Sequence, residues 1–157
     1  MKYKGIIFDF DLTLINRDIA EPFRKKNNWR AVFGLIPQFT LYSGLGEVFE
    51  YIKNSHVQIC IVSNCSTALI KSTCKHFGIP HQHILSGYDK VGNMNKALQL
   101  MNLQPNEVIS FGDGVGDMEA SNTNDILFIP CCWDNKELIN IHNHIINPIQ
   151  IVDIIKG

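Results

Sequence analysis

The stretch GIIFDFDLTL, Gly5 to Leu14, carries the strongest fold signal in the chain. Its residues 6–8 form a continuous apolar run, typical of a parallel strand that helices bury on both faces. The run ends at Asp9 and Asp11, and ligands bind beyond the carboxyl ends of the strands in an open parallel sheet. Two carboxylates this close repel each other unless a shared proton or a bound cation relieves them. Because aspartates also open turns, this motif needs support from elsewhere in the chain.

That support comes from a second acidic group after another apolar run. The sequence EVISF at Glu107–Phe111 predicts a buried strand, and GDGVGD at 112–117 follows it directly. Its glycines permit tight backbone and close approach to a ligand, while Asp113 and Asp117 add two carboxylates at the end of a strand. Asp-Gly alone is a common turn signal, but the two groups together indicate a site.

A third strand is predicted at Val57–Asn64, which is rich in β-branched residues. It ends in Ser63 and Asn64, whose hydroxyl and amide groups can donate hydrogen bonds. We expect a helix to follow with Ser66 as its N-cap, so that free N–H groups at its start face an anion.

The pattern of alternating strands and helices predicts an α/β fold, a three-layer, Rossmann-like, doubly wound parallel sheet. Further strands are expected at 83–86 and 125–130, and a helix near Leu45–Lys53. The acids meet only if the first and fourth strands are neighbours, and Ser63 requires the second strand on the other side of the first. The inferred strand order is therefore 3-2-1-4-5, in a single domain over residues 1–157 with a small insertion at 15–42.

Composition excludes several other classes of protein. The 157 residues are 45% hydrophobic and 18% charged, with a formal net charge of −1, so no electrostatic case for nucleic-acid binding exists. Asp9 interrupts the first apolar run too early for a signal peptide or a membrane span. Five cysteines without CxxC spacing favour free thiols, and we expect a cytoplasmic protein.

The order DFDLTL, VSN, a lysine region and GDGVGD resembles the haloacid dehalogenase superfamily, and nearly the whole chain shares this likeness. The resemblance implies a magnesium-dependent phosphatase with a minimal cap. Asp9 would be the nucleophile that forms an aspartyl-phosphate, and Asp11 the acid/base. Mg²⁺ would be held by the Asp9 carboxylate, the Asp11 backbone carbonyl, Asp113 and Asp117. Leu12 departs from the family, in which glycine is frequent at that position.

The phosphoryl oxygens would be bound by Thr13, Ser63, Asn64 and a lysine, again as the resemblance implies. The usual lysine-proline signature is absent, which leaves two lysines. We favour Lys90, in the predicted loop SGYDKVGN, over Lys96, which begins the predicted helix NKALQLMNL and is readily explained as an exposed helix residue.

Substrate choice is the least determined property. The insertion at Ile15–Tyr42 has room for about two short helices, given a rise of about 1.5 Å per residue, so the site would be open or completed by a second copy in a homo-oligomer. The expected partner is a small phosphorylated substrate. A phosphomutase, a receiver-like phosphoacceptor and a non-catalytic scaffold remain alternatives.

Overall fold

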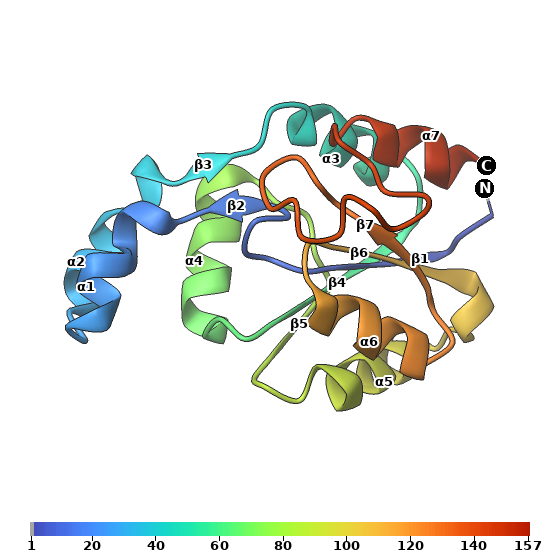
Figure 1. Cartoon of the computed structure of the whole chain (residues 1–157), viewed down its shortest axis with the longest axis horizontal. Helices are drawn as coiled ribbons and strands as arrows, with labels where there is room; N and C mark the ends of the chain where they lie inside the picture. The colour runs from blue at the N-terminus through green and yellow to red at the C-terminus, as the bar shows by residue number, and fades with distance from the viewer. Residues whose placement is uncertain (1) are drawn as a thin grey trace.

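A five-stranded parallel sheet forms the centre of the structure, a computed structural model that describes residues 2–157 (Figure 1). Its strand order is β5-β4-β1-β6-β7, which confirms the predicted order 3-2-1-4-5. The strands are β1 (Gly5–Phe8), β4 (Gln58–Ser63), β5 (His83–Ser86), β6 (Val108–Gly112) and β7 (Leu127–Pro130). Strand β1 is central because its apolar residues are fully buried between neighbours on both sides.

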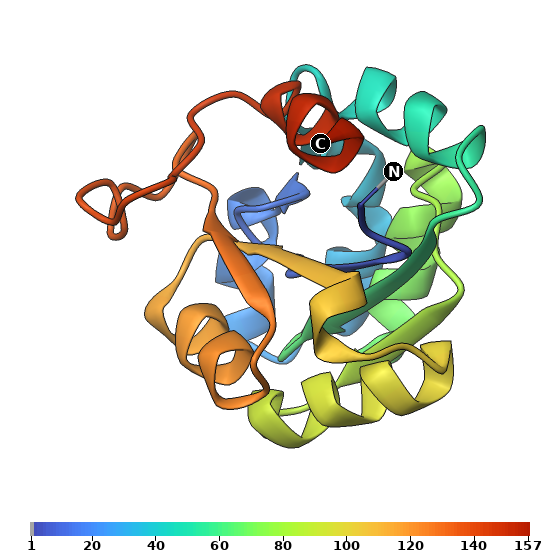
Figure 2. The same cartoon turned by 90° about the vertical axis from the view of Figure 1, so that its right-hand side faces the viewer.

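Helices cover both faces of this sheet, as Figures 1 and 2 show. One apolar core forms with α3 (Leu45–Lys53), α4 (Thr67–Phe77) and α7 (Gln150–Lys156). A second core forms with α5 (Lys90–Met101) and α6 (Val115–Thr123). The predicted three-layer α/β class is therefore confirmed.

The sheet register places the ends of three strands side by side. Phe8, the last residue of β1, pairs with Ile61 of β4 and with Phe111 of β6. The Phe8 and Phe111 rings stack with their centroids 5.5 Å apart. The residues that follow these strands therefore emerge at one edge of the sheet.

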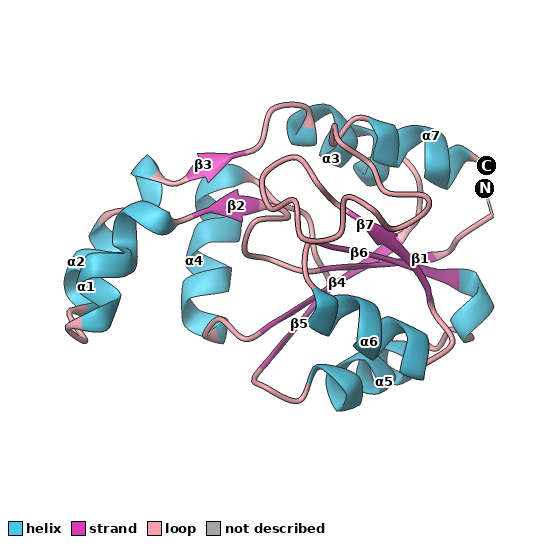
Figure 3. Ribbon diagram, in the orientation of Figure 1, coloured by secondary structure: helices cyan, strands magenta, loops and turns pink. Residues whose placement is uncertain are grey.

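The insertion at 15–42 forms a small cap at one end of the molecule (Figure 3). It contains the two expected short helices, α1 (Glu21–Lys25) and α2 (Trp29–Gly34), with the 3-10 turns η1 (Asp18–Ala20) and η2 (Ile36–Gln38). The antiparallel strands β2 (Ile15–Asn16) and β3 (Thr40–Leu41) form the stem that joins the cap to the sheet. This stem was not predicted, because strands of two residues have no detectable period.

The start of α5 differs from the sequence-based expectation. Lys90 was expected in a loop and Lys96 at the helix start, but α5 begins at Lys90. Asp89 is its N-cap and accepts a hydrogen bond from the Gly92 backbone N–H at 2.9 Å. Gly92 and Asn93, which resemble turn residues in the sequence, lie in the first turn of the helix.

None of the helices within residues 2–157 combines the length and the apolar character needed to cross a membrane.

Candidate active site

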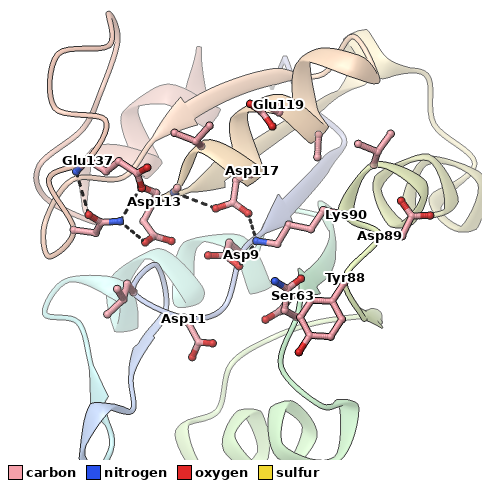
Figure 4. A pocket seen from close by; sticks show the side chains of 18 residues that line it. Asp9, Asp11, Ser63, Tyr88, Asp89, Lys90, Asp113, Asp117, Glu119 and Glu137 are labelled. Atoms are coloured by element: carbon pink, nitrogen blue, oxygen red, sulfur yellow. Dashed lines mark hydrogen bonds and ion pairs between the residues drawn. The ribbon is translucent and has the colours of Figure 1, made fainter. Parts of the chain in front are cut away.

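Three aspartates from separate parts of the chain converge at the carboxyl edge of the sheet (Figure 4). Asp9 follows β1, Asp113 follows β6, and Asp117 lies in the first turn of α6. All three side chains are buried, and carboxylate oxygens of the three lie within 4.8 Å of one another. Oxygen ligands from a few carboxylates suit a small, hard cation such as Mg²⁺, so the donor set fits the metal that the sequence indicated.

The backbone around Gly112 allows Asp117 to approach. A Cβ atom at position 112 would lie 2.6 Å from the Asp117 Cβ, closer than real atoms pack. One Asp117 oxygen also accepts a hydrogen bond from the Gly114 backbone N–H at 3.2 Å, at the start of α6. Glycine at position 112 therefore allows the helix-borne carboxylate to lie against the strand end.

Lys90, the first residue of α5, points toward Asp9 and Asp117 (Figure 4). Its Nζ donates to Asp117 at 2.6 Å and to Asp9 at 3.4 Å. Burial, reinforced by the Asp117 charge, raises the pKa of Asp9 well above its usual range, although Lys90 opposes the shift. Burial also raises the pKa of Asp117 against the opposing effect of Lys90. One ammonium group thus does not compensate three buried carboxylates, and a further cation would be favourable here.

Two side chains orient Asp113. The Thr13 hydroxyl, fully buried, donates to the Asp113 carboxylate at 3.3 Å. The Asn135 amide donates to the same carboxylate at 3.0 Å. These contacts fix the carboxylate by the outer-shell hydrogen bonding that is typical of metal ligands.

Ser63 and Asn64 lie where β4 ends, beside the acidic group. The Ser63 side chain is buried, and its Oγ accepts a hydrogen bond from the Cys65 backbone N–H at 3.1 Å. Helix α4 follows, and Ser66 accepts from the Leu69 N–H as its N-cap, as predicted.

Asp11 lies apart from the other acids. Its carboxylate points away from Asp9 in Figure 4 and accepts hydrogen bonds from Arg17 Nε at 2.5 Å and Nη2 at 2.9 Å. The turn that carries it is tight, because Leu12 donates its backbone N–H to the Ile15 carbonyl. Leu12 has φ of 60°, in the left-handed region that glycine adopts without strain.

These residues surround an open pocket of about 600 Å³ (Figure 4). Seven of the residues that the sequence singled out line it: Asp9, Asp11, Ser63, Asn64, Lys90, Asp113 and Asp117. The alternative lysine, Lys96, is exposed on α5 and does not line the pocket. Tyr88, with 90% of its surface exposed, also lines the pocket.

Thr13 was expected to bind the phosphoryl oxygens, but its position does not allow a direct contact with a phosphate in the pocket. Its hydroxyl is fully buried behind Asp113 and does not line the pocket. Arg17 and Asn135 were missed as site residues. Arg17 lies in the insertion that follows the acidic motif, and Asn135 lies in an irregular segment; neither belongs to a motif that would mark it.

Comparison with known proteins agrees with this geometry. The family model for haloacid dehalogenase-like hydrolases matches residues 18–130, a range that contains Ser63, Lys90, Asp113 and Asp117 but begins after Asp9 and Asp11. No curated protein sequence matches the chain.

Many solved structures share the fold. A predicted phosphoglycolate phosphatase from Haemophilus somnus has a TM-score of 0.83 at 15% identity, over 99% of both chains. A haloacid dehalogenase-like family hydrolase from Streptococcus pneumoniae has a TM-score of 0.82 at 16% identity, over 98% of this chain and 99% of that one. CbbY from Rhodobacter sphaeroides, solved with phosphate, has a TM-score of 0.76 at 13% identity, over 95% of this chain and 96% of that one. At such identities the structures show the fold alone, and it is the family model, matched over most of the chain, that shows the protein to be a haloacid dehalogenase-like hydrolase.

Proposed function

We propose that this protein is a magnesium-dependent phosphatase that hydrolyses small phosphomonoesters through a phosphorylated aspartate. The observation that carries the proposal is the convergence of Asp9, Asp113 and Asp117 beside Lys90, in a pocket that Asp11 and Ser63 also line. Family membership supports hydrolysis as the reaction class.

Asp9 is the nucleophile in this proposal. One of its carboxylate oxygens forms a bond to phosphorus while the bond between phosphorus and the ester oxygen breaks. Water then attacks the phosphorus, the bond to the Asp9 oxygen breaks, and inorganic phosphate leaves. Its place at the end of the central strand, buried and fixed by the sheet, supports this role because a rigid nucleophile loses little freedom on reaction.

Asp11 is the acid/base. Its carboxylic acid gives a proton to the departing alkoxide in the first half-reaction, and the resulting carboxylate takes a proton from the attacking water in the second. The lysine ammonium at position 90 and the hydroxyl and amide at positions 63 and 64 would bind the phosphoryl oxygens as negative charge spreads over them.

Mg²⁺ would be held by the Asp9 and Asp113 carboxylates and the Asp11 backbone carbonyl, with Asp117 ligating or orienting the shell, and would neutralise phosphoryl charge. Thr13 and Asn135 would keep Asp113 in the orientation that this site needs.

The test is release of inorganic phosphate from p-nitrophenyl phosphate, ethyl phosphate, sugar phosphates and phosphoglycolate, with magnesium and with EDTA. Phosphoglycolate belongs in this panel because the similar Haemophilus somnus protein bears the name of a phosphatase for it. We expect release only with magnesium, and a phosphorylated Asp9 detectable by mass spectrometry after an acid quench.

Two variants sharpen the test. Asp9→Asn should abolish turnover while circular dichroism still shows the folded protein. Asp11→Asn should lower kcat/KM much more for ethyl phosphate than for p-nitrophenyl phosphate, whose good leaving group needs little protonation. Turnover by Asp9→Asn would refute the covalent route, and phosphorylation without phosphate release would instead favour a receiver-like phosphoacceptor.

A further inference from the structure

The ion pair between Arg17 and Asp11 has no place in the proposed reaction steps. The guanidinium group binds both carboxylate oxygens, at 2.5 and 2.9 Å, in the two-pronged geometry that makes arginine pairs specific. The Arg17 side chain is only 17% exposed, and that of Asp11 is 36% exposed. Burial lowers the pKa of Arg17, but the hydrogen bonds to Asp11 outweigh this effect and leave the pKa raised.

The two residues belong to different parts of the molecule. Asp11 lies in the turn after β1, within the catalytic edge of the sheet. Arg17 follows β2, in the stem, and is the residue immediately before η1, where the cap begins. The pair thus joins the candidate acid/base directly to the first residues of the cap.

The orientation of Asp11 in this pair conflicts with its proposed role. Its carboxylate points away from Asp9 (Figure 4), whereas an acid must reach the ester oxygen of a phosphoryl group held at Asp9. Both of its oxygens already accept hydrogen bonds from Arg17. Before the carboxyl group can give a proton to a departing oxygen, at least one of these hydrogen bonds has to break.

We propose that Arg17 is a positioning residue that holds the Asp11 carboxylate turned out of the phosphate site, so that the pair has to open before Asp11 can act on a bound substrate. This inference rests on the proposed phosphatase function. Once released, the Asp11 carboxylate takes up a proton from solvent and gives it to the alkoxide as the bond from phosphorus to oxygen breaks. The carboxylate that remains accepts a proton from the attacking water in the second half-reaction, and this proton passes to solvent when Asp11 pairs with Arg17 again. A residue that follows β2 in the cap stem therefore limits how readily the acid/base becomes available.

The test measures kcat/KM of the magnesium-loaded protein for two small esters that reach little of the cap. Arg17→Met keeps the length of the side chain but cannot hold Asp11. We expect kcat/KM for ethyl phosphate to rise about fivefold, which is the scale of one well-formed ion pair, and kcat/KM for p-nitrophenyl phosphate to stay within about twofold. Arg17→Lys, which cannot span both oxygens, should give a smaller rise.

Two controls isolate the pair. In an Asp11→Asn background, Arg17→Met should change neither value, because its effect passes through the Asp11 carboxylate. Arg24→Met removes another cap arginine, which pairs with Glu21 on the surface and makes no contact with Asp11, and should also change neither value.

A fall in kcat/KM for ethyl phosphate, or an equal change in the Asp11→Asn background, would overturn the proposal. The proposal would also be overturned if kcat/KM for both esters were the same in Arg17→Met and Arg17→Lys as in the wild-type protein. If the wild-type protein released no phosphate from either ester with magnesium, the phosphatase proposal itself would fail and this inference with it. If the wild-type protein were active but the Arg17 variants did not change kcat/KM for ethyl phosphate relative to p-nitrophenyl phosphate, only the role of Arg17 would be refuted.

Discussion

Lys90 Nζ lies 2.6 Å from an Asp117 oxygen, so a lysine that opens one helix is paired with an aspartate in the first turn of the next. The same ammonium group reaches Asp9 at 3.4 Å. Among the residues that line the pocket, all of which the structure describes, Lys90 is the only lysine or arginine. It therefore stabilises the acidic group in the absence of metal and lies where a phosphoryl group would need positive charge.

Replacing Lys90 by methionine should lower kcat/KM for p-nitrophenyl phosphate by about 10²–10³-fold, since a preorganised electrostatic contact of this kind contributes that much. The measurement is steady-state phosphate release at saturating magnesium. Lys96→Met is the matched control, because Lys96 is exposed on the same helix and should retain full activity. Loss of activity in Lys96→Met with retention in Lys90→Met would reverse the assignment of the phosphate-binding lysine.

Asp9→Asn should raise the free energy of unfolding of the metal-free protein at neutral pH, because it removes a buried carboxyl whose pKa burial raises well above its usual range. A carboxyl with a raised pKa contributes stability below its ordinary pKa of 3.8, and this contribution is lost as pH rises through the folded-state pKa. The advantage of Asp9→Asn should thus be small near pH 4 and grow with pH.

Urea unfolding in EDTA at several pH values measures this difference. Saturating magnesium should shrink or reverse it, since the wild type gains a metal-carboxylate contact that the amide lacks. A variant that is less stable than the wild type in EDTA at neutral pH would contradict the cost assigned to the buried charge.

The sequence predicted the sheet well because the physical signal there is strong and repeated. Three apolar runs each end in polar residues, and Asp9 lies beside both Asp113 and Ser63 only if β1 lies between β4 and β6. The predicted helix at Leu45–Lys53 matches α3, because apolar residues recur on one face. The prediction of the sheet therefore rested on agreement among distant parts of the sequence rather than on the local propensity of any one segment.

The parts that were missed depend on contacts between segments without a period of their own. Asn135 reaches Asp113 from an irregular segment, and no residue pattern marks that contact in advance. The start of α5 was displaced because Gly92 and Asn93 look like turn residues, while the Asp89 cap that places them in a helix depends on one hydrogen bond. Arg17 reaches Asp11 only because the tight turn after β1 brings residues 11 and 17 together, and no sequence motif marks that contact.

Thr13→Val should weaken magnesium binding by about tenfold, because outer-shell partners of metal ligands contribute on that scale. The change keeps the volume of the side chain but removes the hydroxyl that donates to Asp113 at 3.3 Å. Thr73→Val is the matched control: Thr73 is also fully buried and donates to the Leu69 carbonyl within α4, away from the pocket.

The measurement is the rise in melting temperature of each variant with magnesium concentration. Both substitutions should alter stability by about 1 kcal/mol, the contribution of one hydrogen bond. Only Thr13→Val should shift the magnesium dependence. Equal magnesium dependence in the two variants would show that the Thr13 hydroxyl does not orient a metal ligand.

Gly112→Ala should reduce kcat/KM by at least about tenfold while leaving the protein folded, since even small displacements of a catalytic group are costly. The added Cβ would meet the Asp117 side chain at 2.6–2.7 Å, so that carboxylate has to move from Lys90 and from the other acids.

Gly46→Ala is the control. Its Cβ meets nothing within 4 Å on the exposed side of α3, and the substitution should raise the free energy of unfolding by about 0.5–1 kcal/mol with unchanged activity. Activity, melting temperature and magnesium titration of both variants test this point. Wild-type magnesium affinity and turnover in Gly112→Ala would mean that the contact between the strand end and α6 does not set the position of Asp117.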